Sequence, residues 1–549
     1  MRTSKRLESE SKSKSKPGLG SLKQWGFRLA AVSLSFLALA GVEIVLRVAS
    51  PAFLVPGADE KQMPAGLPYF RIERAGESRV YTPSSYYSPW GHRFRFEQPK
   101  PRGVFRIFCL GGSAVNGASL GNPGAFPRWL EVMLSAVDLS TDYEVINSGQ
   151  PGFPSAEVLA LEKQVLEAGP DLLMVYLGNN EFLWNREQAG RVRWPEPLLV
   201  FKYDAQKLWL IRLIQSALHP VARPWADFAQ GPEGMRQNAA RYLQSAAKNS
   251  WDRDHYSWVL AQFRSNLETM VDLAQARGVR IILGTVAVNL RDWEPHGSYH
   301  RADFPQSQVL RWDLAVQAGK AAFAQGQFEQ ARADFLQAAA LDQTPASLNF
   351  LLGHCFLKLG DPASASGYFL AAADRDSQRD RAGSDLNALV REVAREKGVP
   401  LLDLERIFQE KAADRVPGDE LFLDNVHPNF EGHRIIAESL LNLMIANGWV
   451  PTPGPWQNPA SQAAAAYQGR MPSAYLFNSY YSAASWDAFL GRFLHAQRWA
   501  QKALQYQPKQ PRGLELRSQL DSILSRYSAN PSLPWGEVDF ARRDEGAGR

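Results

Sequence analysis

Four short motifs, far apart in the sequence, carry the groups that a hydrolytic site requires. A serine hydroxyl becomes a nucleophile when a base takes its proton and when N–H groups hold the negative charge that develops on the attacked carbonyl oxygen. The motifs are "GGSAVNG" with Ser113, "NSGQPG" with Gly152, "GNNE" with Asn180 and "DNVH" with Asp424 and His427. These residue types predict attack on a carboxylic ester or a similar acyl group.

The base is expected in the last of these motifs. Asp424 and His427 are three residues apart, and the Pro-Asn pair that follows favours a helix start, which leaves the two side chains in a loop. A carboxylate at this spacing reaches Nδ1 of the imidazole, so that Nε2 faces outward. We expect His427 to act as the base for Ser113 and Asp424 to orient it. His433 falls inside the next helix and is predicted to be structural.

The oxyanion is expected to be held by three donors from three motifs. They are the backbone N–H groups of Ser113 and Gly152 and the side-chain amide of Asn180. Glycine and asparagine also occupy turns for conformational reasons alone, so these two positions carry a second reading as turn formers.

The elements that position these motifs alternate between short apolar strands and longer helices. Because strands separated by helices of this length form parallel sheets covered on both faces, the pattern predicts a doubly wound α/β domain. Ligands bind at the carboxyl ends of the strands in such sheets, where Ser113 lies. The predicted strands are 104–110, 143–149, 171–178, 279–288 and 399–404, and the predicted helices are 126–137, 155–169, 258–278 and 384–398.

With all four motifs in this order, the chain resembles the SGNH hydrolases, also called GDSL-type esterases or lipases. The resemblance covers about residues 100–185, 255–290 and 385–447. It implies a flavodoxin-like three-layer α/β/α sandwich without a metal or an organic cofactor. The chain departs from the family pattern at Gly112 and Glu181, where the family usually has aspartate, and neither residue transfers a proton in the scheme above.

The N-terminus has the pattern of a membrane anchor. Residues 1–28 contain eight Lys and Arg against two acidic residues, and 29–46 form an apolar run whose only charge is Glu43. Eighteen helical residues span roughly 27 Å, close to the hydrocarbon core of a bilayer. A positive flank stays in the cytoplasm, which predicts a single-pass inner-membrane protein with a periplasmic or extracytoplasmic body. A cleaved signal peptide is the alternative, since "ALA" at 38–40 resembles a cleavage site.

A repeat with a period of 34 residues interrupts the α/β pattern. Gly319, Gly326, Ala331, Phe335 and Ala338 recur as Gly353, Gly360, Ala365, Phe369 and Ala372, and a weaker copy has Gly491, Ala496, Ala503 and Pro508. The period and residue types resemble the tetratricopeptide repeat, in which small residues let two helices approach closely. Repeats of this kind usually bind peptides or partner proteins. The alternative is that the helical pairs only pack on the catalytic domain, and the sequence leaves both open.

Charge and cysteine content exclude other classes. The net charge of +5 comes from the N-terminal tail, whose local +6 leaves the rest of the chain close to neutral, so nucleic acid is not an expected partner. The two cysteines, Cys109 and Cys355, are predicted to be buried apolar thiols without a disulfide. No cluster has zinc spacing and no loop has phosphate-binding spacing.

The sequence thus predicts a membrane-anchored serine esterase or O-acyl hydrolase, with acylated envelope glycans or lipids as plausible substrates. An acyltransferase with a sugar acceptor would use the same residues, and a scaffold with an idle site is a further alternative. The predicted parts are a basic tail (1–28), a membrane segment (29–48), an irregular collar (49–100), the first hydrolase part (101–308, with a helical insertion at 185–250), a repeat-like insertion (309–384), the second hydrolase part (385–450) and a helical repeat-like region (451–549).

Overall fold

The computed structural model describes residues 68–75, 78–84, 94–183, 253–452 and 454–525, all of which belong to one compact unit of the chain. The predicted membrane segment and the predicted helical insertion at 185–250 lie outside these residues. Within the described residues, no helix has both the length and the apolarity that crossing a bilayer requires.

The centre of the fold is a five-stranded parallel sheet. Its strand order is β5-β4-β6-β7-β8, which is the flavodoxin-like order expected from the resemblance. The central strands are apolar runs because helices bury both of their faces. The strands are β4 (Val104–Gly111), β5 (Asp142–Gly149), β6 (Leu172–Tyr176), β7 (Arg280–Gly284) and β8 (Leu401–Leu402).

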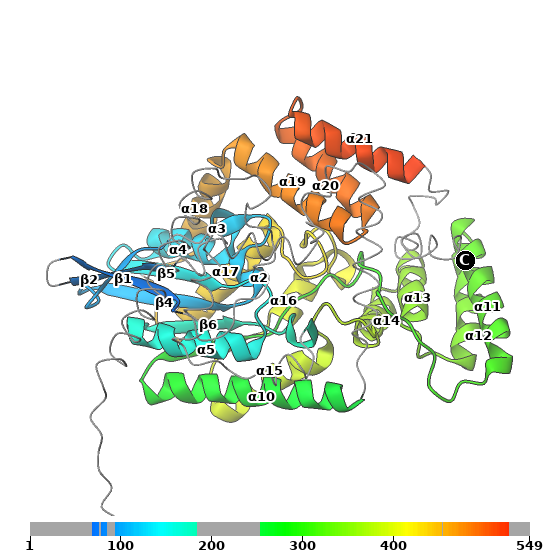
Figure 1. Cartoon of the computed structure of the whole chain (residues 1–549), viewed down its shortest axis with the longest axis horizontal. Helices are drawn as coiled ribbons and strands as arrows, with labels where there is room; N and C mark the ends of the chain where they lie inside the picture. Colours follow the sequence, from blue (N-terminus) through cyan, green and yellow to red (C-terminus); the bar gives the residue numbers. More distant parts are fainter. Residues whose placement is uncertain (1–67, 76–77, 85–93, 184–252, 453, 526–549) are drawn as a thin grey trace, which may run out of the picture. The chain divides into compact units, whose positions relative to one another are not determined.

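Helices cover the sheet on both sides, as Figure 1 shows. One face carries α4 (Phe126–Val137) and α17 (Phe430–Ala446), and the other carries α5 (Ser155–Val165), α10 (Arg253–Ala276) and α15 (Ser384–Lys397). The three-layer α/β/α prediction is therefore confirmed for the described residues. Short elements complete this part: α2 (Ser113–Asn116), α3 (Gly121–Gly124), η3 (Leu166–Ala168), η4 (Glu181–Leu183), α16 (Leu404–Lys411) and η6 (Ala413–Arg415).

The prediction of an irregular collar at 49–100 is wrong for the residues described there. They form a three-stranded antiparallel sheet of β1 (Phe70–Ala75), β2 (Ser78–Pro83) and β3 (Phe96–Gln98). Aromatic contacts hold it to the main sheet, since the rings of Phe70 and Phe96 lie 6.3 and 5.8 Å from that of Phe108 on β4. The strands are only six, six and three residues long, so the alternation typical of strands gives a weak signal there.

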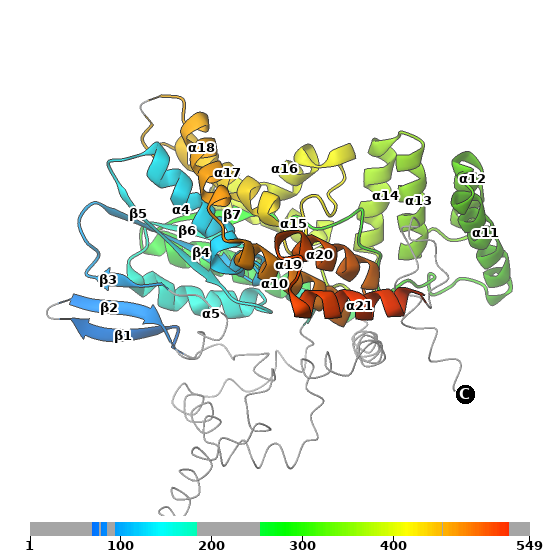
Figure 2. The ribbon, with the colours of Figure 1, turned by 90° about the horizontal axis from the view of Figure 1, so that it is seen from above.

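Two helical hairpins follow β7, where the 34-residue period predicted them. They are α11 (Gln306–Ala324) with α12 (Phe328–Leu341) and α13 (Ala346–Lys358) with α14 (Pro362–Asp374), and they lie next to one another in Figures 1 and 2. A Cβ on Gly319 would lie 2.5 Å from the Phe335 ring, and one on Gly353 would lie 2.9 Å from the Phe369 ring. The repeated glycines thus let the paired helices approach closely, while the tetratricopeptide assignment itself stays a resemblance.

The C-terminal region is helical as well. Ala496 and Ala503 of the weaker repeat copy are fully buried on one of its helices. Cys109 and Cys355 are both buried and free, as predicted. The C-terminal helices are α18 (Gln457–Gly469), α19 (Ser473–Phe489), α20 (Phe493–Tyr506) and α21 (Pro511–Ser525).

Candidate active site

The nucleophile candidate lies where β4 passes into a short helix. β4 ends at Gly111, and Ser113 is the first residue of α2 after the extended Gly112. The end of β4 is joined to its neighbour, because the N–H of Gln150 donates to the carbonyl of Gly111 at 2.9 Å. The Ser113 hydroxyl therefore lies at the carboxyl edge of the sheet, the edge at which ligands bind in such folds.

The structure brings Ser113, His427 and Asp424 into contact across more than three hundred residues. Nε2 of His427 lies 2.7 Å from Oγ of Ser113, and Nδ1 lies 2.5 Å from Oδ2 of Asp424. With Asp424 ionised, Nδ1 carries the proton and Nε2 accepts the hydrogen bond of the serine hydroxyl. This is the order of contacts that the spacing of the motifs predicted.

The side chain of Asp424 is a buried carboxylate. Its other oxygen, Oδ1, accepts the backbone N–H groups of Val426 at 2.9 Å and His427 at 2.8 Å. Burial acts to raise the pKa of Asp424, but the His427 imidazole and these N–H groups outweigh it and leave the pKa below its ordinary value. The carboxylate is therefore ready to orient an imidazolium.

Asn180 and Gly152 lie in adjoining loops beside the nucleophile turn. The side-chain amide of Asn180 donates to the carbonyl of Phe153 at 3.0 Å, and Gly152, one residue earlier, has a φ of 77° that favours glycine. A Cβ on Gly112 would lie 2.5 Å from Nδ2 of Asn180. The Asn180 amide thus occupies the space where a larger residue at 112, such as the family's aspartate, would begin.

Glu181, the second departure from the family pattern, supports the loops. Its carboxyl accepts the backbone N–H and the hydroxyl of Ser155, both at 2.8 Å, at the start of α5. Burial raises the pKa of Glu181 to about 7, although both hydrogen bonds from Ser155 act to lower it.

His433 is structural as predicted. Its Nδ1 accepts the N–H of Phe126 at 3.2 Å, and burial lowers the pKa of His433 to about 3.

The titration of Glu181 predicts a pH-dependent stability. Folding raises the pKa of Glu181 from 4.5 to about 7, so the folded state binds the proton more tightly than the unfolded state. The stability that this proton contributes is fully present below pH 4.5 and is lost as the pH rises through about 7. We expect wild type to lose about 2 to 3 kcal/mol relative to Glu181→Gln between about pH 5 and about pH 8. Urea denaturation of both proteins at the two pH values measures this difference. Equal pH dependence in the two proteins would contradict it.

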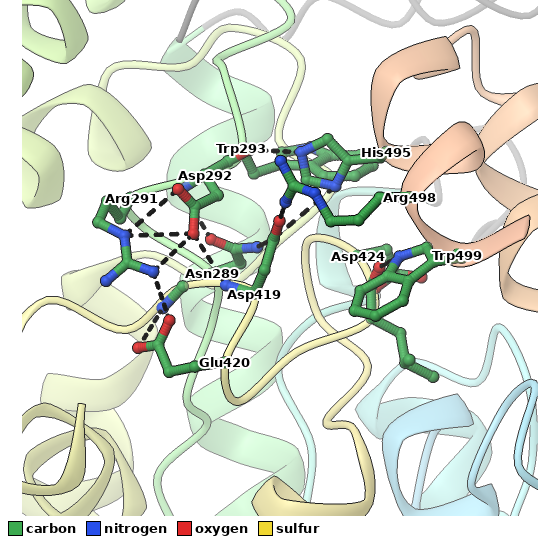
Figure 3. A network of polar contacts seen from close by, with 12 residues as sticks. Asn289, Arg291, Asp292, Trp293, Asp419, Glu420, Asp424, His495, Arg498 and Trp499 are labelled. Atoms are coloured by element: carbon green, nitrogen blue, oxygen red, sulfur yellow. Dashed lines mark hydrogen bonds and ion pairs between the residues drawn. The ribbon is translucent and has the colours of Figure 1, made fainter. Parts of the chain in front are cut away.

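Sequence reasoning missed the contacts that the C-terminal helices make around the Asp424–His427 loop. Figure 3 shows His495, Arg498 and Trp499 reaching from α20 toward Asp292, Asp419 and the chain at Asp424. The linker after α14 also meets the site loops, because the N–H of Ala382 donates to Oδ1 of Asn179 at 3.0 Å. None of these residues has a spacing that relates it to the four motifs.

Among the described residues, no group of His, Cys, Asp and Glu has a metal-binding arrangement.

Comparison with known proteins yields only distant structural similarity. No protein-family model matches the chain, and no curated protein matches it. Solved structures similar to it include a lipase/acylhydrolase from Enterococcus faecalis (13% identity, 64% of this chain and 100% of that chain, TM-score 0.29). An acetylxylan esterase from Geobacillus stearothermophilus has 13% identity, with 64% of this chain and 95% of that chain covered and a TM-score of 0.29. The α/β hydrolase enzyme LAE5 from the metagenome of Lake Arreo has 12% identity, with 63% of this chain and 97% of that chain covered and a TM-score of 0.28. TM-scores this low establish no activity for this chain.

Proposed function

We propose that this protein is a serine esterase, a hydrolase of carboxylic ester bonds. The observation that carries the proposal is the pair of contacts made by His427, 2.7 Å to the Ser113 hydroxyl and 2.5 Å to the Asp424 carboxylate. A hydroxyl, an imidazole and a buried carboxylate in this order generate a nucleophile at neutral pH.

The proposed reaction has two steps. Oγ of Ser113 attacks the ester carbonyl while Nε2 of His427 takes the hydroxyl proton, and the resulting imidazolium is stabilised by Asp424. When the C–O bond to the alcohol breaks, His427 returns that proton to the leaving alkoxide, and the acyl group remains on Ser113. Water, deprotonated by His427, then attacks the acyl-enzyme. The bond between Oγ of Ser113 and the acyl carbon breaks, His427 returns the proton to Oγ, and the carboxylic acid leaves. His427 is therefore the base and then the acid in each step.

The oxyanion of each tetrahedral intermediate is proposed to be held by the backbone N–H groups of Ser113 and Gly152 and by the Asn180 amide. Asn180 bonds to Phe153 through one of its two N–H groups, and an amide nitrogen has a second donor to offer. The nearness of Asn180 to Gly112, one residue before the nucleophile, supports this role. Such donors contribute most in a site from which water is excluded.

The setting of the enzyme is proposed from the sequence alone. The basic tail and apolar run of the first 48 residues support a single-pass anchor in the inner membrane with the esterase outside the cytoplasm. In that location, acylated envelope glycans or lipids would be the ester-bearing substrates. A protein or peptide partner for the repeat-like hairpins α11–α14 is likewise a proposal.

The test is covalent labelling with a fluorophosphonate, which reacts with activated serines. We expect wild type to be labelled with a stoichiometry of about one and Ser113→Ala to remain unlabelled. Hydrolysis of p-nitrophenyl acetate, measured with and without a sugar acceptor, then separates release to water from transfer to a hydroxyl. Folded wild type that resists the probe and leaves the ester intact would overturn the proposed function.

A further inference from the structure

The turn that carries Asp424 and His427 is closed at its base by backbone hydrogen bonds. The N–H of Leu423 donates to the carbonyl of His427 at 2.8 Å, and the N–H of Asn429 donates to the carbonyl of Leu421 at 2.9 Å. These bonds set the shape of the turn, but they do not set its position relative to Ser113, which lies on another element.

Helix α20 contacts this turn at Leu423, the residue before Asp424. The indole N–H of Trp499 donates to the carbonyl of Leu423 at 2.6 Å, and Trp499 and Leu423 are only 7% and 1% exposed. The Trp499 ring is itself held in place, since it stacks on Tyr480 of α19 with 5.8 Å between ring centroids. Trp499 therefore connects a packed helical pair to the backbone of the turn.

A second contact from α20 lies a few residues upstream of the turn. Arg498 forms an ion pair with Asp419, and the opposite oxygen of Asp419 accepts the side-chain amide of Asn289 at 2.9 Å. His495 contacts the neighbouring loop, with Nε2 2.8 Å from the carbonyl of Asp292. Figure 3 shows these side chains converging between α20 and the two loops.

The turn also shares an apolar cluster with the second helical hairpin. Val426, which lies between Asp424 and His427, is buried in one apolar cluster with Phe350 of α13 and Phe369 of α14. The turn thus has a hydrogen bond from α20 and shares an apolar cluster with the α13–α14 hairpin. Because closely packed side chains resist displacement, contacts with two helical elements restrict the position of the turn.

We propose that the two helical additions clamp the Asp424–His427 turn and that Trp499 is a positioning residue for the reaction. This inference rests on the proposed function, since it concerns the same site. It also assigns a role to the weak C-terminal repeat copy: the face of α20 that bears Trp499 holds the chain's own catalytic turn rather than a partner peptide.

Trp499→Phe tests the proposal in the full chain, because it removes the N–H donor and keeps an aromatic ring. Trp486→Phe is the matched control, since Trp486 lies on α19 and stacks on Phe489 at 5.6 Å. The number of active sites is counted by exhaustive fluorophosphonate labelling, and kcat is expressed per labelled site. A displaced catalytic group lowers kcat, so we expect about a ten-fold loss in Trp499→Phe with KM unchanged. The control is expected to keep the wild-type kcat.

A merely structural role predicts a different result. Trp499→Phe would then show fewer labelled sites, each with the wild-type kcat, and the proposal would be wrong. Arg498→Gln supplies a second test if Trp499→Phe does not fold, because the Arg498 side chain is 55% exposed. We expect it to lower kcat per labelled site about two- to three-fold. If Arg498→Gln kept the wild-type kcat per labelled site, the proposal that α20 positions the turn would be wrong. If wild type itself showed neither activity nor labelling, the proposed esterase function would be wrong instead.

Discussion

Ser113→Ala and His427→Ala are each expected to lower kcat for p-nitrophenyl acetate by about 10⁴-fold or more, and the double variant should lose no more than either single one. The physical reason is the 2.7 Å contact between Nε2 of His427 and Oγ of Ser113. Because the proposed attack on the ester needs both the hydroxyl and the base that takes its proton, removing either partner removes the same step. Steady-state hydrolysis of the ester by the three variants and wild type measures the losses.

The control for this cycle is His433→Gln, which alters a buried histidine on the helix that follows the turn. His433 bonds to the backbone of Phe126 rather than to Ser113, so any loss in this variant should follow stability rather than kcat per folded molecule. Losses that multiply in the double variant would show that Ser113 and His427 act separately. That result would contradict the proposed triad.

Gly111→Ala is expected to destabilise the fold by about 3 kcal/mol and to reduce the number of labelled active sites. In the parallel ladder Gly111 pairs with Tyr176, and a Cβ at this position would lie 2.0 Å from the carbonyl oxygen of Tyr176. Backbone oxygen cannot move aside as the end of a flexible side chain does, so β4 and β6 must separate at the point where β4 leads to Ser113. Urea denaturation measures the loss.

Gly367→Ala is the matched control for Gly111→Ala. Gly367 is exposed on α14, and a Cβ there would meet nothing within 4 Å. Alanine favours a helix over glycine by about 1 kcal/mol, so this variant should be as stable as wild type or slightly more stable. A Gly111→Ala protein with the wild-type urea midpoint would mean that the close approach of β4 and β6 is not a structural requirement.

Much of the sheet was predictable because its strands carry a strong local signal. Strand β4 was predicted at 104–110 and is found at Val104–Gly111, and α4 was predicted at 126–137 and is found at those residues. Strands buried on both faces are continuous apolar runs, and amphipathic helices carry apolar residues at a spacing of three and four. The antiparallel sheet β1–β3 was missed because its order depends on aromatic contacts with Phe108, which no local pattern reveals.

For the helical hairpins, the pairing of the helices was predictable from local sequence, whereas their packing partner was not. The glycine and phenylalanine of each repeat copy predicted a close helical pair, and Gly319 indeed faces the ring of Phe335. What the hairpins pack against was left open between a partner and the chain itself. The apolar cluster that joins Phe350 and Phe369 to Val426 is made by residues that are distant in sequence and share no motif.

The residues of the proposed nucleophile, base and oxyanion donors were recognisable from the order of residues alone, because the four motifs and the strand ends that bear them are local features. The sequence also determined the alternation that forms a parallel sheet. The folded chain alone reveals that Oγ of Ser113 lies 2.7 Å from Nε2 of His427 and that the Trp499 indole donates to the carbonyl of Leu423. Such contacts depend on the path of every intervening loop and on the packing of α20, and the order of residues along the chain does not encode a distance.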